Sequence, residues 1–327
     1  MSESGVHREA ASTNPVSAID RSAGRRRSDR IVGAARATRE AVDLAMAAAT
    51  ASLPVRVVGP PGSGKQHFAR AIHSWGSRAA GPFVSVSCAA VSDALVGREI
   101  FGGAAAVHPQ LPAEHPGALS RAATGTFFLS SIDRLAETHR QELAKALVEG
   151  RYQREGDGES IPLRARVIAS SPANPDTSPF GDMPHLTILL LPLVDRSEDV
   201  LPLAAHFLRL FADEAGIAPV GFTSDAREAL LAEPWPGNVR EIAERIRQAI
   251  KLAGSGAITA EALLLAAEGD EIPSFKDAKR AFETRYVIGL LRRCSGNISR
   301  AARLAKKDRK DFYDVIRRTG VDPSDFR

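Results

Sequence analysis

One stretch of eight residues restricts the fold of this chain more than any other: "GPPGSGKQ", Gly59 to Gln66. It follows the apolar run "PVRVV" and opens a segment with helical periodicity, "QHFARAIHSW", which is the context of a phosphate-binding P-loop. In such a loop the backbone N–H groups turn toward phosphates and the lysine reaches the terminal phosphate. The predicted nucleotide-binding residues are Gly59, Pro60, Pro61, Gly62, Ser63, Gly64, Lys65 and Gln66.

Strands and helices alternate on both sides of this loop. The apolar segments "PFVSVSC", "GTFFLSS" and "ARVIASS" are separated by helical ones, which predicts a parallel α/β sheet covered on both faces. After Pro192 helical patterns dominate. We therefore expect an α/β core at 31–192 and a helical lid at 193–262, followed by a linker at 263–274.

Charge is distributed unevenly along the chain. The net charge is +4, yet residues 276–327 hold 15 Lys/Arg against 7 Asp/Glu, which leaves about −4 for the rest. A basic end of this kind is typical of a module that binds double-stranded DNA, although it also fits a solvated charged face. Residues 1–30 have no hydrophobic period and predict a disordered basic tail.

Cysteine content and hydropathy exclude several classes of protein. Cys88 and Cys294 lie far apart without a partner motif, which indicates neither a disulfide framework nor a metal site. Apolar runs stay shorter than the roughly 18 residues of a membrane span, and the N-terminus lacks the apolar core of a signal peptide. We expect a cytoplasmic, nucleoid-associated protein without a membrane partner.

Several ordered motifs accompany the P-loop: "EIFG", "LAKALVEGRYQREG", "RVIASS" and "PWPGNVREI", the last at Pro234 to Ile242. Together they resemble the sigma-54-dependent enhancer-binding activators of bacteria, the NtrC/NifA type of AAA+ ATPase, over roughly residues 31–327. The resemblance implies an AAA+ sheet with a helical lid and bound ATP or ADP. It assigns nucleotide sensing to Arg240.

The same resemblance shows which catalytic residues are missing. The family strand "GTLFLDEIG" reads "GTFFLSSID" here, so its Asp and Glu fall on Ser130 and Ser131, and the family Asn that holds the Glu falls on Ser87. A serine hydroxyl supplies neither negative charge for Mg²⁺ nor a useful base. We expect hydrolysis to be lost or very slow. Asp133 is not expected to substitute, because it lies beyond the strand end and would have to swing back against its own backbone.

Three further departures concern the metal, the neighbouring subunit and sigma-54. Gln66 removes the P-loop hydroxyl that normally ligates Mg²⁺, so magnesium binding is expected to be weaker or arranged otherwise. The family's arginine-bearing "FREDLYYRL" becomes "FGDMPHLTIL" at 180–189, which removes the arginine finger. The sigma-54-contacting "GAFTGA" becomes "AVHPQL" at 106–111. Engagement of sigma-54 by the family mechanism is therefore not expected.

The basic segment 275–327 resembles the Fis-type helix-turn-helix that ends these activators. In "GNISRAARLAKKDRKDFYDVIRRTG", Asn297 and Asp308 are suitable N-caps of two helices, with Phe312, Val315 and Ile316 inward on the second. The turn carries Lys306-Lys307 instead of the family's Gly and an apolar residue, which leaves its geometry open. A small helical bundle with a basic face is the alternative. The candidate DNA contacts are Asn297, Arg300, Lys306, Lys307, Arg309, Lys310, Tyr313, Arg317 and Arg318.

The helix before this motif, "SFKDAKRAFETRYVIGLLRRC", has Phe282, Tyr286, Val287, Leu290 and Leu291 along one side. This apolar side fits either a dimerisation surface or packing onto its own helix-turn-helix. A dimer would read an inverted repeat with half-sites about one helical turn apart.

These features predict a DNA-binding transcriptional regulator with a degenerate AAA+ domain that binds nucleotide, hydrolyses it poorly or not at all, and acts independently of sigma-54. Its partners would be DNA, further copies in a homodimer or higher oligomer, and RNA polymerase or another AAA+ regulator. Two alternatives stay open: an active or partner-dependent sigma-54 activator ATPase, and a modulator that forms mixed rings with an active family member.

Overall fold

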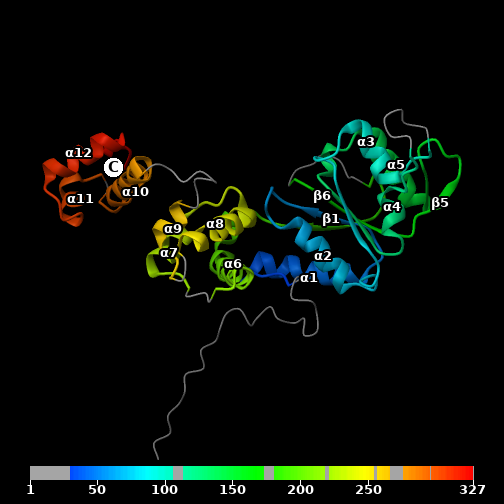
Figure 1. Cartoon of the computed structure of the whole chain (residues 1–327), viewed down its shortest axis with the longest axis horizontal. Helices are drawn as coiled ribbons and strands as arrows, with labels where there is room; N and C mark the ends of the chain where they lie inside the picture. Colours follow the sequence, from blue (N-terminus) through cyan, green and yellow to red (C-terminus); the bar gives the residue numbers. More distant parts are fainter. Residues whose placement is uncertain are drawn as a thin grey trace, which may run out of the picture.

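The computed structural model describes residues 30–105, 113–172, 180–217, 221–253, 256–265, 275–294 and 296–326 (Figure 1). The predicted tail up to residue 29, most of the predicted linker and the "AVHPQL" segment lie outside the described residues. Among the helices that are described, none combines the length and apolar character needed to cross a bilayer.

A parallel five-stranded sheet forms the first half of the molecule, in the order β2-β3-β6-β1-β7. Its strands are β1 Val55–Val58, β2 Phe83–Ser87, β3 Thr126–Ser130, β6 Arg166–Ser171 and β7 Leu186–Leu189. In register, Val55 lies opposite Ile168 and Leu186. All of β6 is buried, as a central strand should be when both faces are covered. The parallel α/β sheet predicted from the sequence is confirmed.

Helices cover both faces of this sheet (Figure 1). They are α1 Arg36–Thr50 and α2 Lys65–Trp75 on one side, and α3 Asp93–Phe101, α4 Gly117–Ala122 and α5 Glu137–Glu149 on the other. The apolar run of β3 serves both layers: Phe127 and Leu129 pack with α3, α4 and α5, while Phe128 packs with α1 and α2. This explains the unbroken apolar sequence of the strand. A short antiparallel hairpin, β4 Arg151–Gln153 and β5 Ser160–Pro162, follows α5.

A helical lid follows the sheet, as the sequence predicted. It contains the 3₁₀ segment η4 Leu193–Asp199 and the helices α6 Val200–Ala215, α7 Ser224–Ala232, α8 Asn238–Ala253 and α9 Ala260–Leu265. Its core is built around Trp235, whose indole N–H donates to the Leu230 carbonyl at 2.9 Å. Ile242 and Ile246 of α8 are fully buried in the same core.

The C-terminal helices pack into a unit with its own core. These are α10 Phe275–Arg293, α11 Ile298–Leu304 and α12 Arg309–Thr319, followed by the 3₁₀ turn η6 Pro323–Phe326. Phe312, Val315 and Ile316 are buried, which confirms the predicted inward face of α12. Val287 and Leu291 of α10 are fully buried in this same core, whereas Tyr286 is exposed. Most of the apolar side of α10 therefore packs onto its own helices.

The two predicted helix caps of this unit differ. The Asn297 side chain accepts a hydrogen bond from Arg300 N at 3.0 Å, which confirms it as the N-cap of α11. Asp308 stands at the N-cap position of α12, but its side chain makes no capping hydrogen bond, so the capping predicted for it is wrong. The turn between them is closed by Lys306, which adopts the left-handed conformation at φ 49°. A glycine adopts this conformation without strain, whereas a lysine rarely adopts it.

Candidate nucleotide-binding site

The P-loop lies at the carboxyl end of β1 and leads into α2. Gly62 and Gly64 adopt positive φ values of 74° and 103°, which a glycine tolerates and other residues rarely adopt. A side chain at Gly59 would place its Cβ 2.6 Å from the Leu190 carbonyl oxygen, and one at Gly62 would collide with the Gly237 carbonyl oxygen. The loop is therefore held by close backbone packing against both the sheet and the lid.

Lys65 is the first residue of α2, and its ammonium group is turned onto the loop. Its Nζ donates to the carbonyl oxygens of Gly59 at 2.6 Å and Pro60 at 2.9 Å. Burial lowers the pKa of Lys65, the Asp133 carboxylate acts in the opposite direction, and Arg240 adds to the lowering. Arg240, the predicted nucleotide sensor, thus lies within electrostatic range of the P-loop lysine.

The lid contacts the P-loop through Asn238. Its side-chain amide donates to the Pro61 carbonyl at 3.0 Å, and its carbonyl accepts from Leu193 N at 2.7 Å. The residue is buried and has a φ of 57°, a conformation in which asparagine is enriched. Arg240 N also donates to the Gly62 carbonyl at 3.2 Å. Asn238 was missed as a functional residue in the sequence, because its partners lie far away along the chain.

The predicted catalytic positions meet at the carboxyl ends of β2 and β3. Ser87 is the register partner of Ser130, and Cys88 N donates to the Ser130 carbonyl at 3.0 Å. Ser131 follows directly, in the left-handed conformation at φ 55° and ψ 48°. Three neutral hydroxyl side chains therefore stand at these two strand ends, and two of them, Ser130 and Ser131, occupy the positions where the resemblance expects carboxylates.

Asp133 lies closer to the P-loop than its place in the sequence suggested. The chain turns at Ser131 into the 3₁₀ turn η3 Ile132–Arg134, so that Asp133 stays beside the strand end. Burial lowers the pKa of Lys65, and the negative charge of Asp133 opposes this lowering. It also acts on Cys88, whose pKa burial raises to about 12 with Asp133 as the second cause. A left-handed serine is a local feature that sequence patterns do not reveal.

A cavity of about 190 Å³ lies next to the P-loop. Its walls are mostly apolar and come from the segment before α1, from α2, and from the lid helices α6 and α8. Two histidines supply polar groups: His67, whose Nε2 lies 2.9 Å from the Arg30 carbonyl oxygen, and His206. Burial lowers the pKa of His206, and the positive groups of His67, Arg209 and Arg30 add to this. An apolar pocket with a few polar groups beside a P-loop is suited to a nucleotide base.

A buried ion pair joins the parts of the chain around this cavity. Asp199 is fully buried and accepts hydrogen bonds from Ala35 N at 2.7 Å and from the Thr38 hydroxyl. Arg196 lies 3.4 Å from the same carboxylate and donates to the Ser63 carbonyl at 3.0 Å. The start of α1, the P-loop and the lid are thereby fixed together. Sequence reasoning also missed this network.

Comparisons with known proteins agree with this geometry. The sigma-54 interaction domain matches residues 31–178, and the AAA+ ATPase lid domain matches residues 194–277. The two matched regions follow one another along the chain, so the chain resembles proteins that carry a sigma-54 interaction domain followed by an AAA+ lid. It is similar to the transcriptional regulatory protein GlrR of Escherichia coli (strain K12), with 30% identity over 85% of this chain and 65% of GlrR.

A second curated relative and two solved structures are also similar to this chain. The hydrogenase transcriptional regulatory protein HoxA of Cupriavidus necator is 36% identical over 71% of this chain and 50% of HoxA. NtrX from Brucella abortus in complex with ADP has a TM-score of 0.65 and 27% identity, over 90% of this chain and 71% of NtrX. The complex of NtrX with ATP gives a TM-score of 0.62 at 26% identity, over 89% of this chain and 69% of NtrX. The chain spans 50% to 65% of the two curated relatives.

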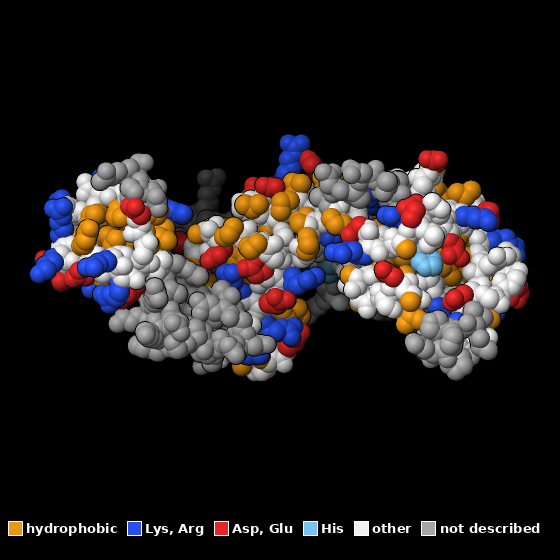
Figure 2. Space-filling view, turned by 90° about the horizontal axis from the view of Figure 1, so that it is seen from above, with side chains coloured by type: hydrophobic (Ala, Val, Ile, Leu, Met, Phe, Trp, Pro, Cys, Tyr) orange, Lys and Arg blue, Asp and Glu red, His pale blue; other side chains and the backbone are white. Residues whose placement is uncertain are grey.

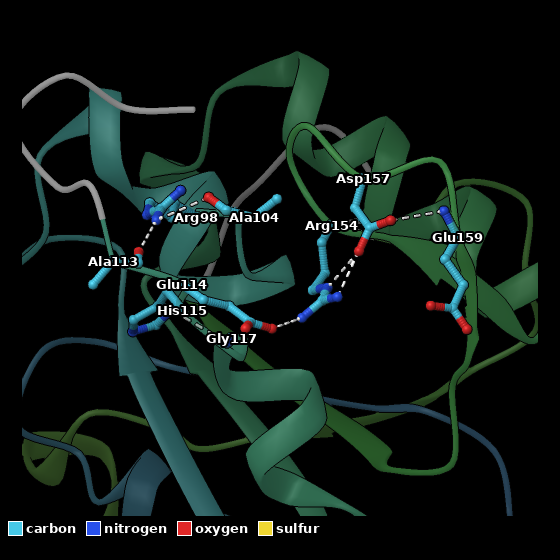
Figure 3. A network of polar contacts seen from close by, with 9 residues as sticks. All are labelled: Arg98, Ala104, Ala113, Glu114, His115, Gly117, Arg154, Asp157 and Glu159. Carbon is cyan, nitrogen blue, oxygen red and sulfur yellow. Dashed lines mark hydrogen bonds and ion pairs between the residues drawn. The ribbon is translucent and has the colours of Figure 1, made fainter. Parts of the chain in front are cut away.

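Polar contacts hold the neck of the loop between α3 and α4 (Figure 3). The nearly buried Arg98 of α3 donates to the Ala113 carbonyl at 2.6 Å, on the far side of the loop. Gly103 and His115 form an antiparallel bridge across the neck. Gly102 and Gly117 approach so closely here that a Cβ on Gly117 would collide with Gly102 N.

The β4–β5 hairpin is tied to this neck (Figure 3). Arg154 forms ion pairs with Glu114 of the neck and with Asp157 of the hairpin turn. Ala104 N donates to the Glu155 carbonyl at 2.9 Å, which joins the two backbones. The predicted sigma-54 register, 106–111, begins just beyond this neck and lies outside the described residues.

The segment that aligns with the family's arginine finger is described. Phe180 is fully buried in the core of the sheet, and the chain then passes through a turn into β7. From Phe180 to Leu189 the segment contains no arginine, so it offers no guanidinium to a neighbouring subunit.

The basic residues predicted to contact DNA gather at the C-terminal end of the molecule (Figure 2). On α12, Arg309, Lys310, Arg317 and Arg318 are all exposed, and Tyr313 is 55% exposed. Arg300, Lys306 and Lys307 are exposed on α11 and the turn, next to the exposed cap Asn297. Arg318 lies 4.0 Å from Glu283 of α10, and within the described residues this is the one ion pair that involves these candidates. The structure thus brings the predicted contacts together on α11, the turn and α12.

Proposed function

We propose that this chain is a DNA-binding transcriptional regulator whose AAA+ domain binds adenine nucleotide but hydrolyses it little or not at all. The observation that carries the proposal is that one site combines the groups that bind a nucleotide with serines at the positions of the hydrolytic acids. The P-loop, the Asn238 contact and the base-sized cavity are intact, while Ser130 and Ser131 stand at the strand end where the family has Asp and Glu. Binding and catalysis are thus separated.

Nucleotide binding is supported by the position of Lys65 and by the relatives. The P-loop N–H groups and the start of α2 suit phosphates, and the cavity between α2 and α6 suits a base. NtrX, similar to this chain in fold, is known in complex with ADP and with ATP. The Lys65 ammonium would leave the carbonyls of Gly59 and Pro60 to meet the phosphates.

Slow hydrolysis follows from what the strand end lacks. A carboxylate that polarises the attacking water contributes about 10² to 10⁴ in rate, and an arginine finger about 10³ to 10⁵. The serines replace the first, and the segment from Phe180 to Leu189 lacks the second. Bound nucleotide would therefore act as a structural or signalling ligand.

DNA binding is supported by the exposed basic face of α11 and α12. A helix that begins at Arg309 and carries Lys310 and Tyr313 on its open side has the length and chemistry to enter a major groove. Two copies would read an inverted repeat. The exposed Tyr286 of α10 is a candidate for contact between copies, while Val287 and Leu291 are used inside one copy.

Independence from sigma-54 is part of the proposal. The sequence at 106–111 places His108-Pro109 where the family has Phe-Thr, and proline restricts φ there. The loop neck below it is held by contacts of Arg98 and Arg154. A loop with an intact base and a changed tip fits a different protein partner, such as another surface of RNA polymerase.

The intact neck also favours a second candidate, a subunit that joins rings of an active relative and modulates them. In such rings the relative would supply the carboxylates and arginine fingers. Mixing the purified chain with an active relative tests this, because co-assembly would change the turnover of the relative in proportion to the amount added. Unchanged turnover and separate elution would exclude this candidate.

The main proposal is tested by nucleotide titration and phosphate release on the same purified sample. We expect saturable binding of ADP and ATP with negligible turnover in the unmodified chain. The Lys65→Met variant should bind neither ADP nor ATP. Restoring the acids in Ser130→Asp/Ser131→Glu should raise turnover only slightly, because the arginine finger is still absent. Turnover near one per second in the unmodified chain would contradict the proposal.

A further inference from the structure

A small polar cavity lies at the opposite end of the strands from the P-loop. It has a volume of about 120 Å³ and lies where β3 and β6 begin, beside the last residues of α1 and α2. Thr126 and Arg166, the first residues of these two strands, are register partners and both line the cavity. The P-loop follows the carboxyl end of β1, so the length of the parallel strands separates the two places.

Arg166 is the buried cation of this cavity. The residue is 7% exposed, and its guanidinium donates to the Leu53 carbonyl from Nε at 3.3 Å and from Nη2 at 3.1 Å. Nη2 also donates to the Ala48 carbonyl at 2.5 Å, in the last turn of α1. Burial lowers the pKa of Arg166 to about 10, and the positive charge of Arg78 adds to the lowering. The partners of Arg166 are thus carbonyl oxygens, which carry no full negative charge.

A second arginine, Arg78, lines the same cavity. Its Nη1 donates to the carbonyl oxygens of Thr124 at 2.8 Å and Arg164 at 2.5 Å. Within the part of the chain that the structure describes, neither Arg78 nor Arg166 forms an ion pair with a carboxylate, and no acidic side chain lines the cavity. Two guanidinium groups therefore share this cavity without a counterion from the described residues.

The charges around the cavity do not balance. The C-terminal ends of α1 and α2 reach it, and each helix end is equivalent to about half an elementary negative charge, so that together they offset about one of the two guanidinium charges. His73, also in the lining, adds no negative charge, and its Nδ1 lies 2.9 Å from the Thr126 hydroxyl. Because burying an excess positive charge is costly unless an anion pairs with it, this place favours an anion.

We propose that this cavity binds a small oxyanion of the phosphate or sulfate class, held by the guanidinium groups of Arg166 and Arg78. Its volume of about 120 Å³ compares with about 30 Å³ for one water in the liquid, so a tetrahedral oxyanion fits whereas a nucleotide does not. The planar fork of arginine matches the oxygens of such an ion. Ser52 and Ser77, two exposed residues of the lining, offer hydroxyl donors. The ion would bind whether or not a nucleotide occupies the P-loop.

Sulfate is titrated calorimetrically into the full chain at constant ionic strength, with sodium chloride as the balancing salt. The P-loop could also capture sulfate, so every protein in this series carries Lys65→Met. We expect saturable binding in Lys65→Met and equal affinity in Lys65→Met/Arg39→Gln, because the exposed Arg39 lies near the opposite end of α1. Lys65→Met/Arg78→Gln should bind sulfate at least about tenfold more weakly, because it loses a charge-assisted donor.

Arg78 is substituted rather than Arg166, because Arg166 also holds the Ala48 carbonyl and its loss would disturb the fold. Lys65→Met/Arg78→Lys keeps the charge but loses the planar fork, so its affinity should fall between those of Lys65→Met and Lys65→Met/Arg78→Gln. Phosphate should rank the variants in the same order as sulfate. Equal sulfate affinity with and without the Arg78 guanidinium, or no saturable binding in Lys65→Met, would overturn the proposal.

Chemical modification locates the ion in the unmodified chain. Phenylglyoxal reacts with arginine side chains, and mass spectrometry of the peptides measures the modification of each arginine. Sulfate should slow the modification of the half-buried Arg78 and leave that of the exposed Arg39 unchanged. Equal modification of Arg78 with and without sulfate would contradict an anion in this cavity.

Discussion

The two sides of the nucleotide site are built from different kinds of contact. On one side, the P-loop meets the lid through backbone groups: Pro61 and Gly62 carbonyls accept from Asn238 and from Arg240 N. On the other side, the end of β3 carries Ser130 and Ser131, at the positions where the family that the sequence resembles has an Asp and a Glu. In the proposed function, binding relies on backbone geometry, which many substitutions leave unchanged, whereas hydrolysis would rely on two carboxylates that two substitutions remove.

The folding role of β3 explains why the serines can be tolerated. Phe127, Phe128 and Leu129 are buried and hold the strand between both helical layers. Ser130 and Ser131 lie at the rim, where a hydroxyl fits without disturbing that core. Serines at these two positions therefore need not reduce stability, and the contrast between the two sides can be tested by separate substitutions.

The largest expected effect comes from Lys65→Met. Removing the ammonium group leaves the phosphates without their nearest cation, and ADP affinity should fall at least about 100-fold. Lys145→Met on the exposed face of α5 is the matched control and should bind ADP like the unmodified chain. Calorimetric titration measures both. Full ADP affinity in Lys65→Met would show that the Lys65 ammonium does not contact the phosphates of the nucleotide.

The second effect concerns the contact between P-loop and lid. Asn238→Ala leaves Leu193 N and the Pro61 carbonyl without their partner, and we expect a loss of about 2 to 3 kcal/mol in the free energy of unfolding of the AAA+ part. Asn297→Ala, which removes the cap of α11, is the control and should cost about 1 kcal/mol in the C-terminal unit only. Hydrogen exchange resolves the two regions. Equal protection of the lid in both variants would contradict the role given to Asn238.

The third effect is a pH dependence at the base cavity. The pKa of His206 is lowered in the folded chain, so the unfolded chain binds more protons as the pH falls below the usual histidine value of about 6.5. Stability is therefore complete above that pH and declines as the pH falls toward the folded pKa, by at most about 1.4 kcal/mol per pH unit. His206→Gln should flatten this decline in thermal unfolding scans between pH 7.5 and 5.5. His139→Gln on α5 serves as the control, and an equal slope for His206→Gln and the unmodified chain would exclude the effect.

The smallest effect lies in the C-terminal turn. Lys306 has a φ of 49°, so Lys306→Gly should stabilise the α11–α12 pair by up to about 1 kcal/mol through relief of backbone strain. Lys306→Ala is the control, because it removes the same charge but retains a Cβ. We expect little change in the stability of the α11–α12 pair in this variant. Hydrogen exchange of the α11 and α12 amides measures both. A destabilising Lys306→Gly substitution would mean that this turn is not strained.

Much of the fold could be predicted from the sequence because its signals are local. The P-loop spacing, the apolar strands and the helical periodicity after Pro192 each report on neighbouring residues. The base cavity and the Asp199 network could not be predicted, because they join segments separated by more than a hundred residues. The place of Asp133 depended on the left-handed Ser131, and residue type gave no signal for that conformation. The absence of a side-chain cap at Asp308 likewise depends on rotamer choice rather than residue type.

The separation of binding from hydrolysis is tested most directly by following the fate of bound ATP in a single turnover. Radiolabelled ATP is mixed with an excess of the full chain and Mg²⁺, and the ratio of ATP to ADP in the bound fraction is measured over time. Active enzymes commonly turn over about 1 to 1,000 times per second, and the missing acids and arginine finger each remove orders of magnitude from such a rate. The predicted result is bound ATP that remains intact for minutes. Conversion of the bound ATP to ADP within seconds would contradict it.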